Sequence, residues 1–135
     1  MTPEVIYSDP FYSHKNGYKF RMYMNPGGFG SGKGVDLSLG FQILPGQFDH
    51  ILMWPMNQKV TIGLINQDKG NIHHKLIFKY DSMSISDKDL FNRPDPESNK
   101  FLGSENFINL DDLVKSNHLC KNDQIIILFI INMTP

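Results

Sequence analysis

Apolar and polar residues alternate along much of the chain, and the spacing typical of an amphipathic helix is nearly absent. The clearest alternation covers residues 35–43, where one face carries Val35, Leu37, Leu39, Phe41 and Ile43. A half-buried strand directs its apolar face inward, so we expect these five side chains to be in the core. Further candidate strands cover residues 18–24, 59–65, 75–80 and 124–132. The last is almost continuously apolar, which favours a central strand covered on both faces.

Turn-forming residues separate these runs, and one segment alone predicts a helix. Gly, Pro and Asn gather at residues 25–28, 44–47 and 91–96, where strands are expected to end. In segment 109–117, Asn109 can cap a short helix, and two aspartates follow where the helix dipole favours negative charge. This pattern predicts an all-β fold, an antiparallel β-sandwich of about seven to eight strands with one short helix. We expect a single domain over residues 1–135.

Composition narrows the class of partner. The chain has 135 residues, of which 40% are hydrophobic and 20% charged, and its formal net charge is −1. A near-neutral domain lacks the basic surface that nucleic acids or anionic membranes require. The longest apolar run, residues 125–131, is far shorter than the roughly 20 residues of a membrane helix. We therefore expect a protein partner, no nucleic acid and no membrane insertion. Cys120 is the single cysteine, which excludes an internal disulfide and favours a cytoplasmic location.

The glycine-rich segment 27–34 is the strongest catalytic candidate, because it contains most of the phosphate-binding loop pattern, including a Gly-Lys pair. Two features argue against nucleotide binding. The residue after Lys33 is Gly34 rather than the Ser or Thr that holds magnesium. The segment also leads into the predicted strand 35–43 rather than into a helix N-terminus that could meet phosphate. A loop that joins two strands is the preferred interpretation.

The other polar residues do not form a recognisable metal or catalytic motif. His73 and His74 are adjacent, and adjacent residues of a strand point to opposite faces, so they are not expected to share a metal ion. Asp111 and Asp112 fit helix capping better than calcium binding. Cys120 is expected to be a half-buried structural thiol. We predict no catalytic residues, no metal and no cofactor, and therefore a protein that is not an enzyme.

A series of short motifs runs in order along nearly the whole chain. It comprises residues 6–13, Gly17-Tyr18-Lys19, Asn25-Pro26-Gly27-Gly28, residues 30–34, Leu37-Ser38-Leu39, Gly46-Gln47-Phe48-Asp49, Trp54-Pro55-Met56, residues 57–62, Leu64-Ile65-Asn66-Gln67, Phe91-Asn92-Arg93-Pro94, residues 103–107 and Lys121-Asn122-Asp123. Their order and spacing resemble the C-terminal MATH domain of TNF-receptor-associated factors (TRAFs). In this interpretation Trp54-Pro55 closes a corner while the indole fills the core.

The resemblance implies an eight-stranded antiparallel sandwich and a non-catalytic interaction domain. TRAF-type domains bind an extended peptide, such as a receptor tail, beside an exposed strand, where main-chain hydrogen bonds give affinity and side-chain pockets select the sequence. We therefore expect a peptide-binding adaptor in a signalling or ubiquitin-ligase complex.

The resemblance also implies the residues that would contact the peptide. Without gaps, the two positions of the family's third strand that contact an acidic peptide residue fall on Tyr23 and Asn25; a gapped alignment would assign Arg21 and Tyr23 instead. The serine cluster of some members falls on Lys88, Asp89 and Leu90, and the strand that pairs with peptide falls on Lys100, Phe101, Leu102 and Gly103. Phe101 and Leu102 either create an apolar preference or simply complete the core.

One family feature is missing. The chain begins after the usual first strand, so an edge is expected to lack its partner, and such an edge can pair with another chain or with a second copy. Homo-oligomerisation through that edge or through flanking regions is therefore expected. The alternative function is a structural or oligomerisation MATH module, as in meprin-like proteins, for which the Asn132-Met133-Thr134 glycosylation pattern is the one direct hint.

Overall fold

The computed structural model describes residues 5–97 and 101–132, which form two antiparallel sheets. The described strands are β1 (Ile6–Tyr7), β2 (Phe11–Tyr12), β3 (Lys19–Asn25), β4 (Asp36–Leu44), β5 (Lys59–Ile65), β6 (Ile72–Phe78), β7 (Leu102–Asn109) and β8 (Ile127–Asn132). The described helices are α1 (Ile85–Lys88), α2 (Leu110–Lys115) and four 3-10 turns at Gly30–Gly32, Asp49–Ile51, Tyr80–Ser82 and Asp89–Phe91. The predicted all-β antiparallel fold is confirmed.

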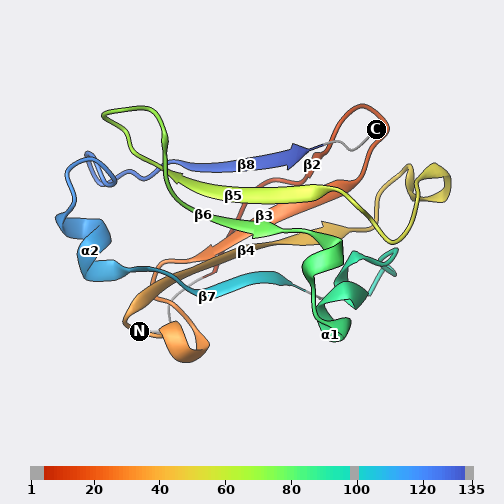
Figure 1. Ribbon diagram of the computed structural model, residues 1–135, viewed down its shortest axis with the longest axis horizontal. Helices are drawn as coiled ribbons and strands as arrows, with labels where there is room; N and C mark the ends of the chain where they lie inside the picture. Colours follow the sequence, from red (N-terminus) through yellow and green to blue (C-terminus); the bar gives the residue numbers. More distant parts are fainter. Residues whose placement is uncertain (1–4, 98–100, 133–135) are drawn as a thin grey trace.

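The two sheets lie face to face (Figure 1). The larger sheet has the order β1-β3-β4-β7, with β2 also paired to β3, and the smaller sheet has the order β6-β5-β8. In Figure 1, α2 lies at one end of the sandwich and α1 at the other. Each sheet therefore presents one face to the core and one face outward.

Aromatic side chains from both sheets fill the space between them. Phe20 of β3 and Phe41 of β4 are completely buried. The ring of Phe129, from β8 in the opposite sheet, lies 5.5 Å from Phe20 and 5.6 Å from Phe41, centroid to centroid. Val60, Ile62 and Leu64, also completely buried, alternate along β5. Each such side chain stabilises the fold by about 1.5–3 kcal/mol through removal of apolar area from water.

The predicted inward face of residues 35–43 is correct for four of its five members. Val35 is wrong: it precedes β4, is 53% exposed, and its carbonyl accepts a hydrogen bond from the backbone N–H of Leu110 at 2.8 Å. The alternate residues of β4 are also buried, including Ser38 and Gln42. Side chains of neighbouring strands and loops cover the outer face of β4, which an alternating pattern does not reveal.

The prediction for the last strand is wrong. Strand β8 begins at Ile127 rather than at Gln124, and among the described strands it lies at an edge of the smaller sheet, paired with β5 alone, instead of at its centre. Its outer face leaves Leu128 40% exposed. The preceding residues form a two-residue turn in which Asn122 and Asp123 have positive φ angles of 52° and 60°. An apolar run shows that side chains avoid water, but not how many strands flank them.

The predicted helix is confirmed as α2, and a second short helix was missed. The Asn109 side chain accepts a hydrogen bond from the backbone N–H of Asp112 at 3.1 Å, as a helix cap does. Helix α1 has one turn, and Ser84 caps it by accepting from the backbone N–H of Asp87. A single turn carries too little apolar periodicity to be recognised in the sequence.

The glycine-rich segment joins β3 to β4, as predicted, and does not lead into an α-helix. It is anchored to the larger sheet through Ser38, whose hydroxyl accepts from the backbone N–H of Phe29 at 3.1 Å and donates to the Glu105 carbonyl at 2.9 Å. Gly28 has φ of +73°, and a Cβ there would collide with backbone atoms of Gly32 and Asp36. Glycine is therefore needed for the path of this loop.

Trp54 lies at the margin of the core instead of filling it. The indole is half-buried and meets the ring of Tyr18 edge to face, with 5.0 Å between centroids. Its Nε1–H donates to the Asp49 carbonyl at 2.8 Å. Because an indole N–H needs an acceptor, the ring stays where the turn backbone supplies one. The neighbouring Met56 is completely buried in its place.

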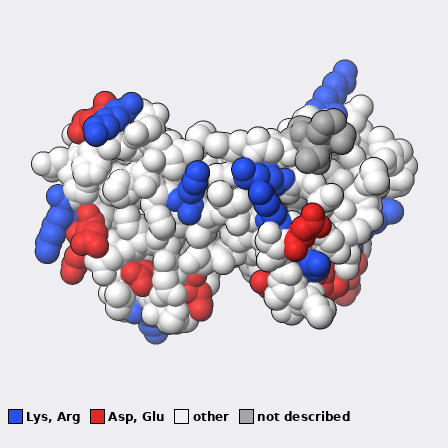
Figure 2. Space-filling view, viewed as in Figure 1, with Lys and Arg blue, Asp and Glu red and all other residues white. Residues whose placement is uncertain are grey.

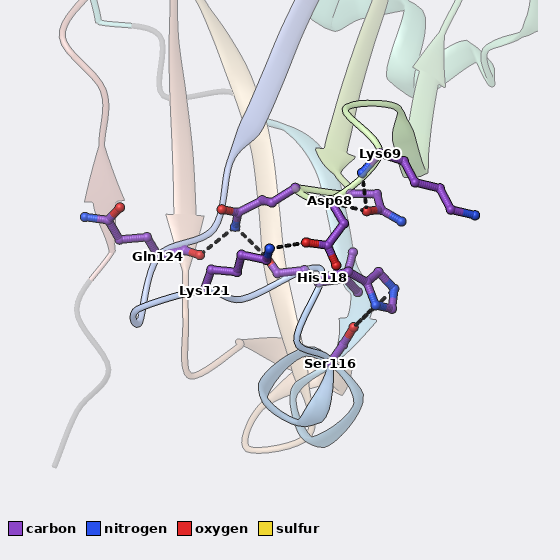
Figure 3. A network of polar contacts seen from close by, with 9 residues as sticks. Asp68, Lys69, Ser116, His118, Lys121 and Gln124 are labelled. Carbon is purple, nitrogen blue, oxygen red and sulfur yellow. Dashed lines mark hydrogen bonds and ion pairs between the residues drawn. The ribbon is translucent and has the colours of Figure 1, made fainter.

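A polar network closes the end of the sandwich near α2 (Figure 3). Gln67 donates through Nε2 to the carbonyl oxygens of Leu119 and Gln124, at 3.0 and 2.8 Å. Lys121 forms an ion pair with Asp68. These side-chain contacts join the β5–β6 turn to the segment between α2 and β8. They act together with a backbone hydrogen bond from Gln67 N–H to the His118 carbonyl at 2.7 Å.

The face in Figure 2 carries both basic and acidic side chains, separated by wide uncharged areas. Within residues 5–97 and 101–132, no helix is long and apolar enough to cross a membrane.

Candidate functional site

The candidate site lies on the outer face of the larger sheet, where one aromatic ring crosses two glycines. Tyr23 of β3 pairs in register with Gly40 of β4, which pairs with Gly103 of β7. The Tyr23 hydroxyl lies 2.6 Å from the place where a Cβ on Gly40 would be, and 2.5 Å from that of Gly103. The ring can lie across the sheet only because these two positions carry no side chain.

Three further aromatic rings surround Tyr23 and come from different parts of the chain. The ring centroid of Phe101, just before β7, is 4.9 Å from that of Tyr23, in an edge-to-face arrangement. Phe29, from the β3–β4 loop, stacks at 6.1 Å from Tyr23. Tyr7 of β1 lies 6.4 Å from Phe101. The four rings thus come from two strands, the β3–β4 loop and the residue just before β7, and they gather on the outer face.

These rings line a surface cavity of about 290 Å³. Its lining comprises Val5, Tyr7, Tyr23, Phe29, Phe101, Gly103, Ser104 and Glu105. Phe101 is 38% exposed and Tyr7 44% exposed, whereas Tyr23 is 6% exposed and forms the floor. Exposed aromatic clusters are uncommon on free surfaces and typical of binding sites.

One charged side chain, Glu105, lines the cavity, and another, Arg21, lies beside it against Tyr7. Burial, followed by the charge of the nearby Glu105 carboxylate and then of Tyr7, raises the pKa of Tyr23 to about 12. Arg21, two residues before Tyr23 on the same face, places its guanidinium carbon 4.0 Å from the centre of the Tyr7 ring. Its Nε donates to Gln42 at 2.8 Å, which holds the guanidinium against the sheet.

The cavity adjoins an open edge of the larger sheet. Strand β7 ends the strand order, and within the described residues only β4 pairs with it. Gly103, Ser104 and Glu105, which line the cavity, belong to β7. An edge strand offers unpaired backbone N–H and C=O groups to another chain. The aromatic cavity therefore lies directly beside backbone that a further strand could use.

Three of the residues expected to contact peptide come together in this cavity: Tyr23, Phe101 and Gly103. Leu102 points the other way and is buried in the core at 7% exposure. Asn25 is also buried, and its side chain accepts from the backbone N–H of Gly27 at 3.0 Å, so it holds the turn after β3. Alternation along β7 separates Leu102 from its two neighbours.

The other expected contact residues lie elsewhere. Lys88 ends α1, with its ammonium 5.1 Å from the centre of the Tyr80 ring. Asp89 and Leu90 follow in a 3-10 turn and line a separate hollow of about 40 Å³. None of the three lines the aromatic cavity. Lys100 falls outside the described residues.

Five lining residues were not expected from the sequence: Val5, Tyr7, Phe29, Ser104 and Glu105. Tyr7 and Phe29 are far apart in sequence from β7, and only strand pairing and the loop path bring them together. Glu105 lies where the register between β4 and β7 shifts, so its position depends on a β-bulge.

His73 and His74 do not lie on separate sides of the sheet, as was expected for adjacent residues of a strand. The register between β5 and β6 shifts by one residue at His73, which leaves it as the extra residue of a β-bulge. As a result, His73 and His74 line the same pocket, together with His118, whose ring lies 5.6 Å from that of His73. Even so, among the described residues no group of three or more His, Cys, Asp and Glu side chains has a geometry that could hold a metal ion.

Comparison with known proteins agrees with this architecture. A profile described as "TRAF/meprin, MATH domain" matches residues 3–128. The chain is 38% identical over 132 residues to mouse TNF receptor-associated factor 5 and 36% identical over 133 residues to human TNF receptor-associated factor 2. These matches cover 96% of the chain in both cases but only 23% and 25% of the relatives, so the chain spans about a quarter of their length.

A solved structure of Notothenia coriiceps TRAF5 superimposes with a TM-score of 0.81 and 29% identity, covering 97% of this chain and 63% of that one. The sandwich and its strand order are thus shared with a TRAF structure along nearly the whole chain. The chain belongs to the TRAF/meprin MATH-domain family.

Proposed function

We propose that this domain binds an extended segment of a partner protein, which adds a strand to the open edge of β7 and places one side chain in the aromatic cavity. The observation that carries the proposal is the contact between these two features: three residues of the edge strand also line the cavity. An edge strand alone gives affinity without selectivity. A cavity beside it lets one side chain of the added strand be selected.

The relatives support a role as an adaptor. Their names describe them as TNF receptor-associated factors, so we propose that the partner segment belongs to a receptor tail or to another protein of a signalling or ubiquitin-ligase complex in the cytoplasm. In this role the domain recruits without catalysis, and its weak binding of single segments would be raised by linkage to further copies.

Peptides with selectively methylated amides test the proposed strand addition without changing the protein. A library of short linear peptides, including receptor-tail sequences, is screened by fluorescence anisotropy against the 135-residue chain. The best binder is then prepared with N-methyl groups on every second backbone amide, in the two possible phases. Because only alternate amides of an added strand face β7, one phase abolishes binding and the other preserves it. Equal binding of both phases would show that no strand is added.

A pair of substitutions tests the cavity. Phe101→Ala removes an exposed ring of the cavity, and we expect the affinity for the best peptide to fall about tenfold or more, as for interface anchors. Ile77→Ala is the control: Ile77 is 44% exposed, close to the 38% of Phe101, but lies on β6 in the other sheet. The control should change affinity by less than about twofold. If no peptide binds, or if both variants behave alike, the proposal is wrong.

A further inference from the structure

The aromatic cavity combines π faces with a negative charge. Tyr7, Tyr23, Phe29 and Phe101 supply four rings, and Glu105 is the one charged residue among the described residues that line the cavity. The face of an aromatic ring carries partial negative charge, so rings that surround a common space attract a cation. A carboxylate at the rim strengthens this attraction and provides acceptors for charged hydrogen bonds.

The surroundings disfavour an anion in the same space. The pKa of Tyr23 is raised to about 12 by burial and by neighbouring negative charge, which means that the floor of the cavity already resists a negative group. An acidic side chain would also meet Glu105. A purely apolar side chain would fit the rings but would remove water from the carboxylate without replacing its hydrogen bonds.

Arg21 does not supply the missing cation. Its guanidinium lies over Tyr7, and its Nε donates to Gln42. Arg21 is not among the residues that line the cavity. The contact shows that a guanidinium can pack on one of these rings, while the space between the rings and Glu105 remains accessible from outside.

We propose that the cavity accepts an arginine side chain of the bound segment, stacked on the aromatic rings and paired with the Glu105 carboxylate. This inference rests on the proposed function, since the arginine belongs to the segment that pairs with β7. Arginine fits better than lysine for two reasons: a planar guanidinium stacks on aromatic faces, and its fork of N–H donors matches a carboxylate. The specificity of the site is therefore for a basic partner residue.

Five peptide libraries test this assignment. They have random sequences and differ only in one fixed central residue: arginine, its neutral isostere citrulline, lysine, glutamate or leucine. Each is titrated against the full chain by fluorescence anisotropy. We expect the arginine library to bind about tenfold more tightly than the citrulline library, with lysine intermediate and glutamate weakest.

Three variants, of which the first two are a matched pair, assign the effect to the cavity. Glu105→Gln should reduce the ratio of arginine to citrulline affinity to about threefold or less. Glu97→Gln removes the same charge from an exposed glutamate outside the cavity lining and should leave the ratio unchanged. Phe101→Leu, which keeps an apolar side chain but removes a π face, should also lower the ratio. Thermal melting of each variant verifies that it is folded.

The outcomes distinguish the two proposals. Binding of peptides without an arginine preference, a preference for glutamate, or an equal response to Glu105→Gln and Glu97→Gln overturns the arginine assignment and leaves the peptide-binding function intact. If none of the five libraries binds, the proposed function and this inference fail together. An arginine preference that depends on Glu105 and Phe101 supports both.

Discussion

Gly40 is a position in the larger sheet where a single added methyl group should be destabilising. An ideal Cβ at this position would lie 2.6 Å from the Tyr23 hydroxyl and 2.6 Å from the Cα of Gly103, and it would also meet the Leu102 carbonyl. Non-bonded heavy atoms prefer separations of about 3.5–4.0 Å, so the neighbours must move by roughly 1 Å. Two of these neighbours are backbone atoms of β7, which cannot rotate away as a flexible side chain can.

We therefore expect Gly40→Ala to lower the free energy of unfolding by about 1–3 kcal/mol, toward the upper end of the range for overpacking. The measurement is urea denaturation followed by tryptophan fluorescence, which reports on Trp54. Because Tyr23 must shift or β7 must separate from β4, the affinity of the aromatic cavity for peptide should fall as well.

Gly63→Ala is the matched control for this prediction. Gly63 lies in β5, the central strand of the smaller sheet, and the atoms nearest its would-be Cβ belong to the side chain of Ile72, at 3.1–3.3 Å. A side chain can adjust, so Gly63→Ala should stay within about 1 kcal/mol of the unmodified protein. A Gly40→Ala variant as stable as the Gly63→Ala variant would refute the close approach of Tyr23 and β7.

Three further predictions concern pH, the core and the second open edge. The raised pKa of Tyr23, about 12 against an ordinary 10.0, means that the folded state holds a proton which the unfolded state loses first, so stability should fall between pH 10 and 12. The free energy of unfolding of Tyr23→Phe, measured by urea titrations at fixed pH, should fall less across that window. An identical fall in both proteins would contradict the burial of the hydroxyl. Phe41→Ala should lower the free energy of unfolding by about 3–5 kcal/mol, because the fully buried ring packs against three other rings. A loss below about 1 kcal/mol would contradict the tight packing of this ring in the core. We also expect self-association through β8, where Ile126 is 48% and Leu128 is 40% exposed beside an edge. Sedimentation should show concentration-dependent dimers that Leu128→Lys removes, and a monomer at every concentration would exclude this edge as a self-pairing site.

The local elements could be predicted from the sequence alone. Alternation located β3, β4 and β5 to within about one residue, since a side-chain period of two is imposed by the extended backbone wherever one face is buried. Asn109 and the two aspartates after it identified α2, because a helix cap is satisfied by residues close in sequence. The order of short motifs identified the family, and with it the sandwich.

Which strands are central and which are edges depends on how distant segments of the chain pair, and it could not be predicted from local patterns. The apolar run of β8 indicated a covered strand, yet its place at an edge depends on which strands pair with it. The same holds for His73 and His74, because one extra residue in a bulge lets both side chains line the same pocket. Register and bulges result from contacts between distant segments, which no local pattern contains.

The cavity illustrates the difference most clearly. Tyr23, Phe101 and Gly103 were predicted to contact peptide and meet there, whereas Leu102, predicted with them, points into the core because of alternation along β7. Tyr7, Phe29 and Glu105 were not predicted, because these residues come from a two-residue strand, a loop and a bulge. The resemblance to TRAF-type domains therefore predicted three residues of the cavity, and the folding of β1, β3 and β7 into one sheet determined which residues share that space.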